Sequence, residues 1–252
     1  MSSEILKETI QGALRYFGVE LRRTGAIADP FVVQRELIST AEPVIFDVGA
    51  HVGSVARKYR GLFPRASIRC FEPFLPSFQT LQENLKDDPR TSVHNVALSD
   101  RTGLAKLHAN LASVTNSLLA SDERGKSYWG DGLLDTAEEV DVRTTTVDDF
   151  VADNGIRSID ILKLDVQGAE FNVLSGARRT LEDQKIDLIY TELILCPTYQ
   201  GQREFHEYLR FLGSVGYTLL DLFNPERNGR QLIQADIVFL SSAFKNRGSR
   251  VS

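Results

Sequence analysis

Residues 44–54 read VIFDVGAHVGS, and this stretch decides the fold. Its first five residues are apolar apart from Asp47 and rich in β-branched side chains, which predicts a short buried strand. Gly49 follows at once, and a segment with helical spacing begins at Ser54 after Gly53. A strand that passes through a glycine turn directly into a helix indicates the first unit of an alternating α/β fold.

The same alternation continues along most of the chain. Further apolar runs predict strands at 67–71, 92–98, 159–165, 186–195, 217–223 and 235–240. Amphipathic segments predict helices at 54–62, 76–85, 168–181 and 202–215. No helix separates the last two strands, which favours an antiparallel pair at one sheet edge. We therefore predict an α/β, Rossmann-like fold: a mostly parallel sheet of about seven strands with helices on both faces.

Two segments lie outside this alternation. Apolar residues at helical spacing over 3–17 and the pair Asp29-Pro30, typical of a helix start, predict an N-terminal helical extension over 1–42. This extension packs on the main domain or serves as a lid or dimer helix. We predict one domain over 43–245, with an insertion at about 100–146 that pairs strands at 103–109 and 140–146 around a long polar loop.

Composition narrows the class of protein. The chain has 252 residues, 42% hydrophobic and 25% charged, which is a globular balance. A formal net charge of −5 argues against nucleic acid as a partner. Cys70 and Cys196 stand far apart and outside any CxxC pair, so no zinc site or disulfide framework is implied. The N-terminus has no secretory pattern and no apolar run is long enough for a membrane span, which predicts a cytoplasmic location; self-association stays open.

Four acidic residues stand at predicted strand ends, where ligands of α/β sheets bind: Asp47, Glu72, Asp165 and Glu192. The glycine loop between Gly49 and Gly53 lets the backbone approach a ligand closely. His51 occupies the position of the middle glycine in the dinucleotide pattern GxGxxG, so the loop lacks the pyrophosphate signature.

Glu72 follows Gly53 by 19 residues and ends the second strand. An acid at this place accepts hydrogen bonds from the hydroxyls of a ribose. A ligand with an adenosine but no phosphate satisfies both observations, and S-adenosylmethionine is such a ligand.

Six ordered motifs resemble the FkbM family of S-adenosylmethionine-dependent methyltransferases, over roughly residues 43–195 and more weakly to 240. They are DVGAHVGS (47–54), FPRASIRCFEPF (63–74), HNVALSD (94–100), NSL (116–118), RTTTVDDF (143–150) and IDILKLDVQGAEFNVLSGA (159–177). The resemblance implies a class I methyltransferase fold and methylation of hydroxyls on sugars, polyketides and related natural products.

The resemblance also implies cofactor contacts. Asp47, Gly49 and Gly53 would line the methionine end of S-adenosylmethionine, and Ala50 and His51 in the same loop would also bind the cofactor. Glu72 would bind the ribose, and the backbone near Ala97 and Leu98 would lie by the adenine. One position departs from the family, which usually has DVEGAE where this chain has Gln167. A family role that needs a charge at this position is therefore not carried over.

Asp165 and Glu192 are the predicted catalytic residues. An alcohol that accepts a methyl group must lose a proton, and a positioned base assists this step. Asp165 lies beside the expected methyl donor and is the leading candidate for that base or for a ligand of the acceptor hydroxyl. It is also a predicted cofactor contact. The alternative is that Asp165 only caps the following helix near Gly168. Glu192 binds acceptor hydroxyls or is a solvated acid at the strand end.

Three further side chains have both a functional and a structural interpretation. His51 shapes the loop through a hydrogen bond, or else acts as a base. Lys163 shares a strand face with Asp165 and can pair with it or with another acid. Glu170 either takes part in function or only complements the dipole of its helix. With Asp165 and Glu192 it could bind a divalent cation, but nothing in the spacing demands one, and we predict no metal.

The predicted function is S-adenosylmethionine-dependent O-methylation of a small-molecule or glycan-like acceptor. In the inserted loop, Asn116 and Ser117 either close over that acceptor or are ordinary polar loop residues. Two alternatives stay open. A nicotinamide oxidoreductase uses a similar sheet but is disfavoured by His51, and a noncatalytic cofactor-binding module is kept open by Gln167.

Overall fold

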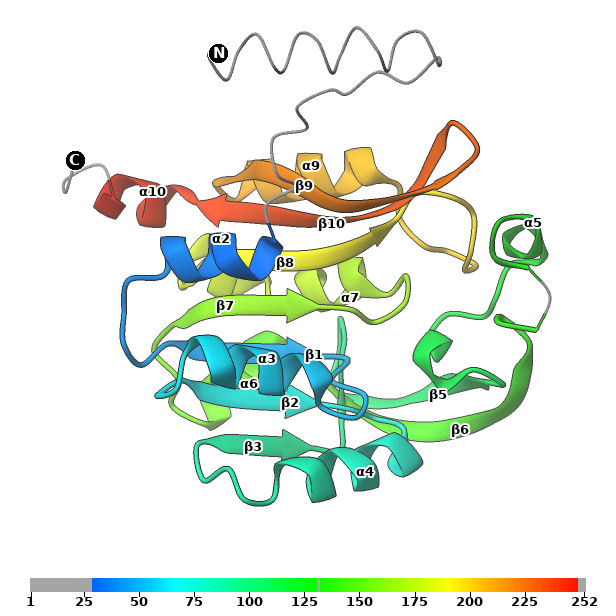
Figure 1. Ribbon diagram of the computed structural model, residues 1–252, viewed down its shortest axis with the longest axis horizontal. Helices are drawn as coiled ribbons and strands as arrows, with labels where there is room; N and C mark the ends of the chain where they lie inside the picture. Colours follow the sequence, from blue (N-terminus) through cyan, green and yellow to red (C-terminus); the bar gives the residue numbers. More distant parts are fainter. Residues whose placement is uncertain (1–28, 131, 249–252) are drawn as a thin grey trace, which may run out of the picture.

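In the part of the chain that the structure describes, seven strands form the central sheet, in the order β3-β2-β1-β7-β8-β10-β9 (Figure 1). They are β1 (Val44–Val48), β2 (Ser67–Phe71), β3 (Thr91–His94), β7 (Ile159–Leu164), β8 (Ile186–Ile194), β9 (Tyr217–Asn228) and β10 (Gln231–Ser241). The first five pair in parallel, and β10 pairs antiparallel with both β8 and β9. The computed structural model describes residues 29–130 and 132–248. The predicted fold class and the antiparallel pair at the sheet edge are confirmed.

The strand order reverses at β1, which lies between β2 and β7. Asp47 is paired with Cys70 on one side and with Lys163 on the other. The chain runs outward from β1 to β3 and then returns to β7, so the loops after β1 and β7 diverge to opposite sides. A crevice outside the carboxyl ends of the strands forms at such a point.

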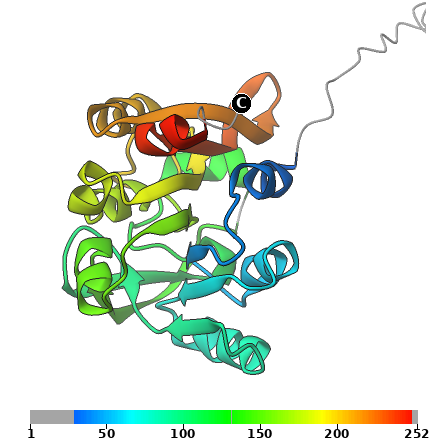
Figure 2. The same ribbon diagram turned by 90° about the vertical axis from the view of Figure 1, so that its left-hand side faces the viewer.

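Helices cover both faces of the sheet (Figure 2). One face carries α2 (Pro30–Leu37), α3 (Ser54–Leu62) and α4 (Leu75–Leu85), and the other carries α6 (Val147–Asp153), α7 (Glu170–Ser175), α8 (Arg178–Glu182) and α9 (Phe205–Ser214). The chain ends its described part with α10 (Ser242–Gly248). Successive strand residues point to opposite faces. Ile45 accordingly belongs to the same core cluster as Tyr59 of α3, whereas Phe46 belongs to the core cluster of Leu174 of α7.

A second, smaller sheet lies beside the carboxyl ends of the main strands (Figure 1). Its order is β4-β6-β5, with β4 (Ala97–Leu98), β5 (Gly103–Asn110) and β6 (Thr136–Thr145). The chain between β5 and β6 contains the 3₁₀ helices η1 (Ser113–Thr115) and η2 (Glu123–Gly125) and the short helix α5 (Lys126–Trp129). The two strands predicted for the insertion are thus present and antiparallel, and β6 begins earlier than expected.

The single strand predicted at 92–98 is wrong, because the chain turns between β3 and β4. Asn95 Nδ2 donates to the carbonyl oxygens of Glu72, at 3.0 Å, and Pro73, at 2.9 Å. These bonds hold the turn against the segment after β2, so Leu98 leaves the main sheet and pairs with Thr145 in the small one.

The helix predicted at 168–181 is divided into α7 and α8. Gly176 separates them, and its carbonyl accepts from the backbone N–H of Asp148 instead of continuing a helix. A Cβ at Gly176 would lie 2.0 Å from the Ser99 carbonyl oxygen, so only glycine allows this approach.

The remaining helix boundaries follow local capping. Helix α9 begins at Phe205 rather than near 202, because Glu204 and Glu207 form a capping box. Asp29 caps α2 as predicted, accepting from the backbone N–H of Phe31 at 2.8 Å. The helix predicted over 3–17 lies outside the described residues. No helix in the described part of the chain is long and apolar enough to cross a lipid bilayer.

Candidate active site

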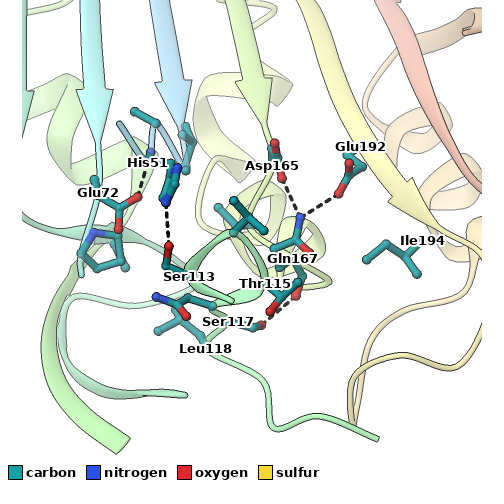
Figure 3. A pocket seen from close by; sticks show the side chains of 18 of the residues that line it. His51, Glu72, Ser113, Thr115, Ser117, Leu118, Asp165, Gln167, Glu192 and Ile194 are labelled. Carbon is teal, nitrogen blue, oxygen red and sulfur yellow. Dashed lines mark hydrogen bonds between the residues drawn. The ribbon is translucent and has the colours of Figure 1, made fainter. Parts of the chain in front are cut away.

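A cavity of about 470 Å³ lies at the carboxyl ends of β1, β2, β7 and β8 (Figure 3). Eight of the predicted site residues line it: Gly49, Ala50, His51, Glu72, Ala97, Leu98, Asp165 and Glu192. The insertion covers it through residues 113–118 and parts of 129–134, and the β9–β10 hairpin contributes Glu226 and Gln234. Two predicted residues, Asp47 and Gly53, do not line this cavity.

The glycine loop follows β1 and crosses the ends of its two neighbours. The backbone N–H groups of Gly49 and Ala50 both donate to the Phe71 carbonyl at 3.0 Å. Gly49 has a φ of +77°, and a Cβ there would lie 1.8 Å from the Asp165 carbonyl oxygen. The turn therefore requires glycine at this position. Gly53 serves packing instead, because a Cβ there would lie 2.9 Å from Leu81.

One end of the cavity contains Glu72, His51, Ala97 and Leu98, and we call it the Glu72 end. Glu72 Oε2 accepts from the backbone N–H of His51 and its Oε1 from that of Phe74, both at 2.9 Å. The side chain is 7% exposed. Burial raises the pKa of the Glu72 carboxyl to about 7, although the two N–H donors favour its charged form. Each oxygen keeps lone-pair capacity for a ligand.

His51 joins the glycine loop to the insertion. Its Nε2 lies 3.0 Å from Ser113 Oγ, and the two side chains point toward each other (Figure 3). Burial lowers the pKa of the His51 imidazole. The negative charge of Asp165 raises this pKa, and the positive charge of Lys163 lowers it further. The lowered pKa favours the neutral ring, and the contact with Ser113 is consistent with the loop-shaping role.

Asp47 lies beneath the loop, where it partners Lys163. Asp47 is fully buried, and Lys163 Nζ is 3.1 Å from its Oδ1 and 3.5 Å from Asp165 Oδ2. Asp47 makes no well-aligned hydrogen bond with any described residue, so this ion pair balances its charge. Burial alone would lower the pKa of the Lys163 ammonium, but the two carboxylates raise it, and the group stays charged.

Asp165, Gln167, Glu192 and Gln234 form what we call the carboxylate end of the cavity. Gln167 Nε2 donates to Asp165 Oδ1 and to Glu192 Oε2, both at 2.9 Å (Figure 3). Gln234 Nε2 donates to the other oxygen of Glu192 at 2.7 Å. The Asp165 side chain is 36% exposed. Asp165 is therefore the carboxylate that is open to a ligand, whereas both oxygens of Glu192 already accept from amides.

The pKa of the Glu192 carboxyl is raised to about 9, by burial first and then by the charges of Asp165, Glu170 and Asp236. Lys163 opposes this shift. The shift favours the protonated form of Glu192, whereas the amide donors from Gln167 and Gln234 favour its charged form.

Glu170 points away from the cavity. It is 1% exposed, and its Oε1 accepts from the backbone N–H groups of Val166, at 2.9 Å, and Gly168, at 3.2 Å. Glu170 thus caps the turn before its own helix, which is the role considered for Asp165. Across residues 29–130 and 132–248, no three His, Cys, Asp or Glu side chains are grouped so that they could hold a metal ion.

The loop of the insertion is anchored to the carboxylate end. Ser117 Oγ donates to the Gln167 carbonyl at 2.7 Å. The hydroxyl of Tyr199 lies 3.1 Å from both the Thr115 carbonyl oxygen and Gln167 Oε1. Asn116 accepts from the backbone N–H of Asn110 through its side-chain oxygen.

The sequence did not predict Tyr199 or Gln234 as site residues, because neither belongs to a local motif. Gln167 stood out only as a departure from the family.

Comparison with known proteins gives one family. A sequence model described as the methyltransferase FkbM domain matches residues 47–219. The 2-O-methyltransferase NoeI of Sinorhizobium fredii is 32% identical over 213 residues, which cover 82% of this chain and 86% of that protein. The 31-O-demethyl-FK506 methyltransferase FkbM of Streptomyces tacrolimicus is 28% identical over a region that covers 76% of this chain and 78% of that protein. The hexuronic acid methyltransferase AglP of Haloferax volcanii is 25% identical over a region that covers 64% of this chain and 61% of that protein.

Proposed function

The chain belongs to the FkbM methyltransferase family, and from this premise we propose that it methylates a hydroxyl of a sugar, glycan or other natural product with S-adenosylmethionine. The observation that carries the proposal is the arrangement of the cavity. A buried carboxylate held by two backbone donors stands at one end, and a half-exposed carboxylate follows β7 at the other. The first suits a ribose and the second suits a hydroxyl acceptor.

The residues present fit S-adenosylmethionine. Glu72 offers two oxygens side by side, and a carboxylate of this kind accepts from two neighbouring ribose hydroxyls. The loop at Gly49 passes within contact of the Asp165 backbone, and in this proposal it would lie beside the methionine part of the cofactor. His51 replaces the glycine that a pyrophosphate would require. When bound, S-adenosylmethionine supplies an activated methyl group on a positively charged sulfur.

Asp165 acts on the acceptor in this proposal. Its exposed carboxylate accepts a hydrogen bond from the acceptor hydroxyl, orients that oxygen, and takes its proton as the methyl group is transferred. A positioned base of this kind contributes about 10²–10⁴-fold to a rate. Orientation of the acceptor in line with the methyl group contributes more, about 7–11 kcal/mol in favourable cases. Glu192 holds a second hydroxyl of the acceptor or keeps Asp165 in place.

The proposal includes an assignment of segments. The methyltransferase domain spans 43–245, the segment 1–42 is an N-terminal extension, and the insertion at about 100–146 selects the acceptor. Variable loops on a rigid scaffold commonly carry specificity. The insertion residues Ser113, Thr115 and Ser117 line the cavity, which supports this assignment. We also propose a cytoplasmic location.

Methyl transfer is tested with S-adenosylmethionine labelled in its methyl group and fractionated small-molecule extracts of the host. We expect the purified protein to move label to a polyhydroxylated compound, and Asp165→Asn to abolish most of this transfer. Asp153→Asn is the matched control, because Asp153 is an exposed carboxylate at the end of α6 and does not line the cavity. Binding of a nicotinamide dinucleotide in place of S-adenosylmethionine would contradict the proposal.

A further inference from the structure

Gln167 uses both of its side-chain N–H groups on carboxylates. Its Nε2 is 2.9 Å from Asp165 Oδ1 and 2.9 Å from Glu192 Oε2 (Figure 3). An amide nitrogen has two hydrogens, and each is directed at a different acid. The two carboxylates come from neighbouring strands, β7 and β8, and are 27 positions apart in the chain. Gln167 therefore joins them with one rigid group.

The orientation of this amide is fixed by its surroundings. An ionised carboxylate only accepts hydrogen bonds, so the amide nitrogen faces Asp165, and Gln167 Oε1 lies 3.1 Å from the Tyr199 hydroxyl. The ring of Tyr199 reaches this position because Gly168 has no side chain, and a Cβ there would lie 2.7 Å from the ring. Ser117 Oγ holds the Gln167 carbonyl, and the Gln167 backbone has a φ of +54°. Such left-handed backbone is strained for residues other than glycine and persists where its neighbours hold it.

A neutral amide is the group that the surrounding charges require. Asp165, Glu170 and Asp236 raise the pKa of the Glu192 carboxyl through their negative charges, and the positive charge of Lys163 opposes them. A glutamate at position 167 would add another carboxylate, and in its protonated form it would offer one hydrogen rather than two. Gln234 also donates to Glu192 but has no hydrogen bond to Asp165. Gln167 alone among these groups contacts both acids.

We propose that Gln167 is a positioning residue, whose side-chain amide holds Asp165 and Glu192 as a fixed pair. The amide occupies Asp165 Oδ1, and Lys163 lies 3.5 Å from Oδ2. Between them these two contacts fix the rotation of the Asp165 carboxylate and leave its remaining lone pairs to a ligand. The inference rests on the proposed function only in that the ligand is the methyl acceptor.

Carboxyl-carbon NMR of the full chain tests the pair directly, without cofactor or acceptor. Gln167→Met keeps the side-chain length and removes both donors. We expect the titration midpoint of Glu192 to rise by about one pH unit, because a charged carboxylate loses a hydrogen bond. We also expect the Asp165 resonance to move at pH 7. Gln234→Met is the matched control, which raises the Glu192 midpoint and leaves the Asp165 resonance in place.

An Asp165 resonance that does not move in Gln167→Met would overturn the proposal. Gln167→Asn is the second variant, because asparagine tolerates left-handed backbone well but its amide is one methylene too short to reach both acids. It should reproduce both changes in a folded protein. If neither variant folds, Gln167 is a requirement of the fold and the proposal also fails. Failure of methyl transfer would leave these NMR results unchanged, so the two proposals fail separately.

Discussion

The two ends of the cavity are built in different ways. At the Glu72 end, Glu72 and its two hydrogen-bond donors lie in segments that follow β1 and β2 directly, and both donors are backbone N–H groups. At the carboxylate end, the contacts join side chains from β7, β8 and β10 and from the loop at Tyr199. Backbone donors persist through substitution, whereas side-chain contacts do not. Under the proposed function, the Glu72 end would bind the constant cofactor and the carboxylate end an acceptor that differs between relatives.

Asp165→Asn, at the carboxylate end, should have the largest effect on turnover. The amide cannot take the proton of a hydroxyl, so we expect turnover to fall about 10²–10⁴-fold. Affinity for S-adenosylhomocysteine, measured by calorimetry, should change little, because Glu72 and its donors are untouched. Asp153→Asn should behave like the parent. Full turnover in Asp165→Asn would remove Asp165 as the base.

Glu72→Gln, at the Glu72 end, should weaken cofactor binding without affecting methyl transfer itself. The amide loses one acceptor and directs N–H groups at a backbone donor from His51 or Phe74. The loss of hydrogen bonds to a charged group predicts cofactor binding weaker by about 10–100-fold. Turnover at saturating cofactor should stay near that of the parent. Unchanged affinity would count against the ribose role.

The two ends should also differ in their response to pH. The pKa of Glu72 is about 7 because the group is buried, and its charged form accepts from hydroxyls. Protonation at lower pH removes this capacity, so affinity for S-adenosylhomocysteine should fall roughly tenfold from pH 8 to pH 6. Glu72→Gln should show a flat profile over the same range. An equally steep decline in that variant would assign the titration to another group.

Ser113→Ala should have the smallest effect, because it removes one hydrogen bond that joins the insertion to the glycine loop. A loss of about 1 kcal/mol predicts cofactor binding weaker by about fivefold. Ser113→Thr keeps the hydroxyl and is the matched control. If both variants bind as the parent does, His51 is positioned by its backbone alone.

The difference between the two ends of the cavity also explains how much of the site could be predicted from sequence. Asp47, the glycine loop and Glu72 belong to runs of consecutive residues, so their place at the strand ends followed from the strand pattern. Asp165 and Glu192 were found for the same reason. Tyr199 and Gln234 reach the site through contacts between distant segments, which no local pattern reports.

The errors in the fold have the same origin. The strand at 92–98 was predicted as one element because its apolar residues are continuous. The turn depends on Asn95, which donates to carbonyls 22 and 23 residues away. The helix at 168–181 has continuous helical spacing, and its break at Gly176 depends on the approach of Ser99. In both cases, tertiary contacts overrode a local preference.

A crystal structure of the protein with S-adenosylhomocysteine tests the central claim most directly. We predict both ribose hydroxyls within hydrogen-bond distance of the Glu72 carboxylate, with the sulfur directed toward Asp165. A ribose bound away from Glu72, or a cavity that leaves S-adenosylhomocysteine out and takes up a nicotinamide dinucleotide under the same conditions, would contradict the account.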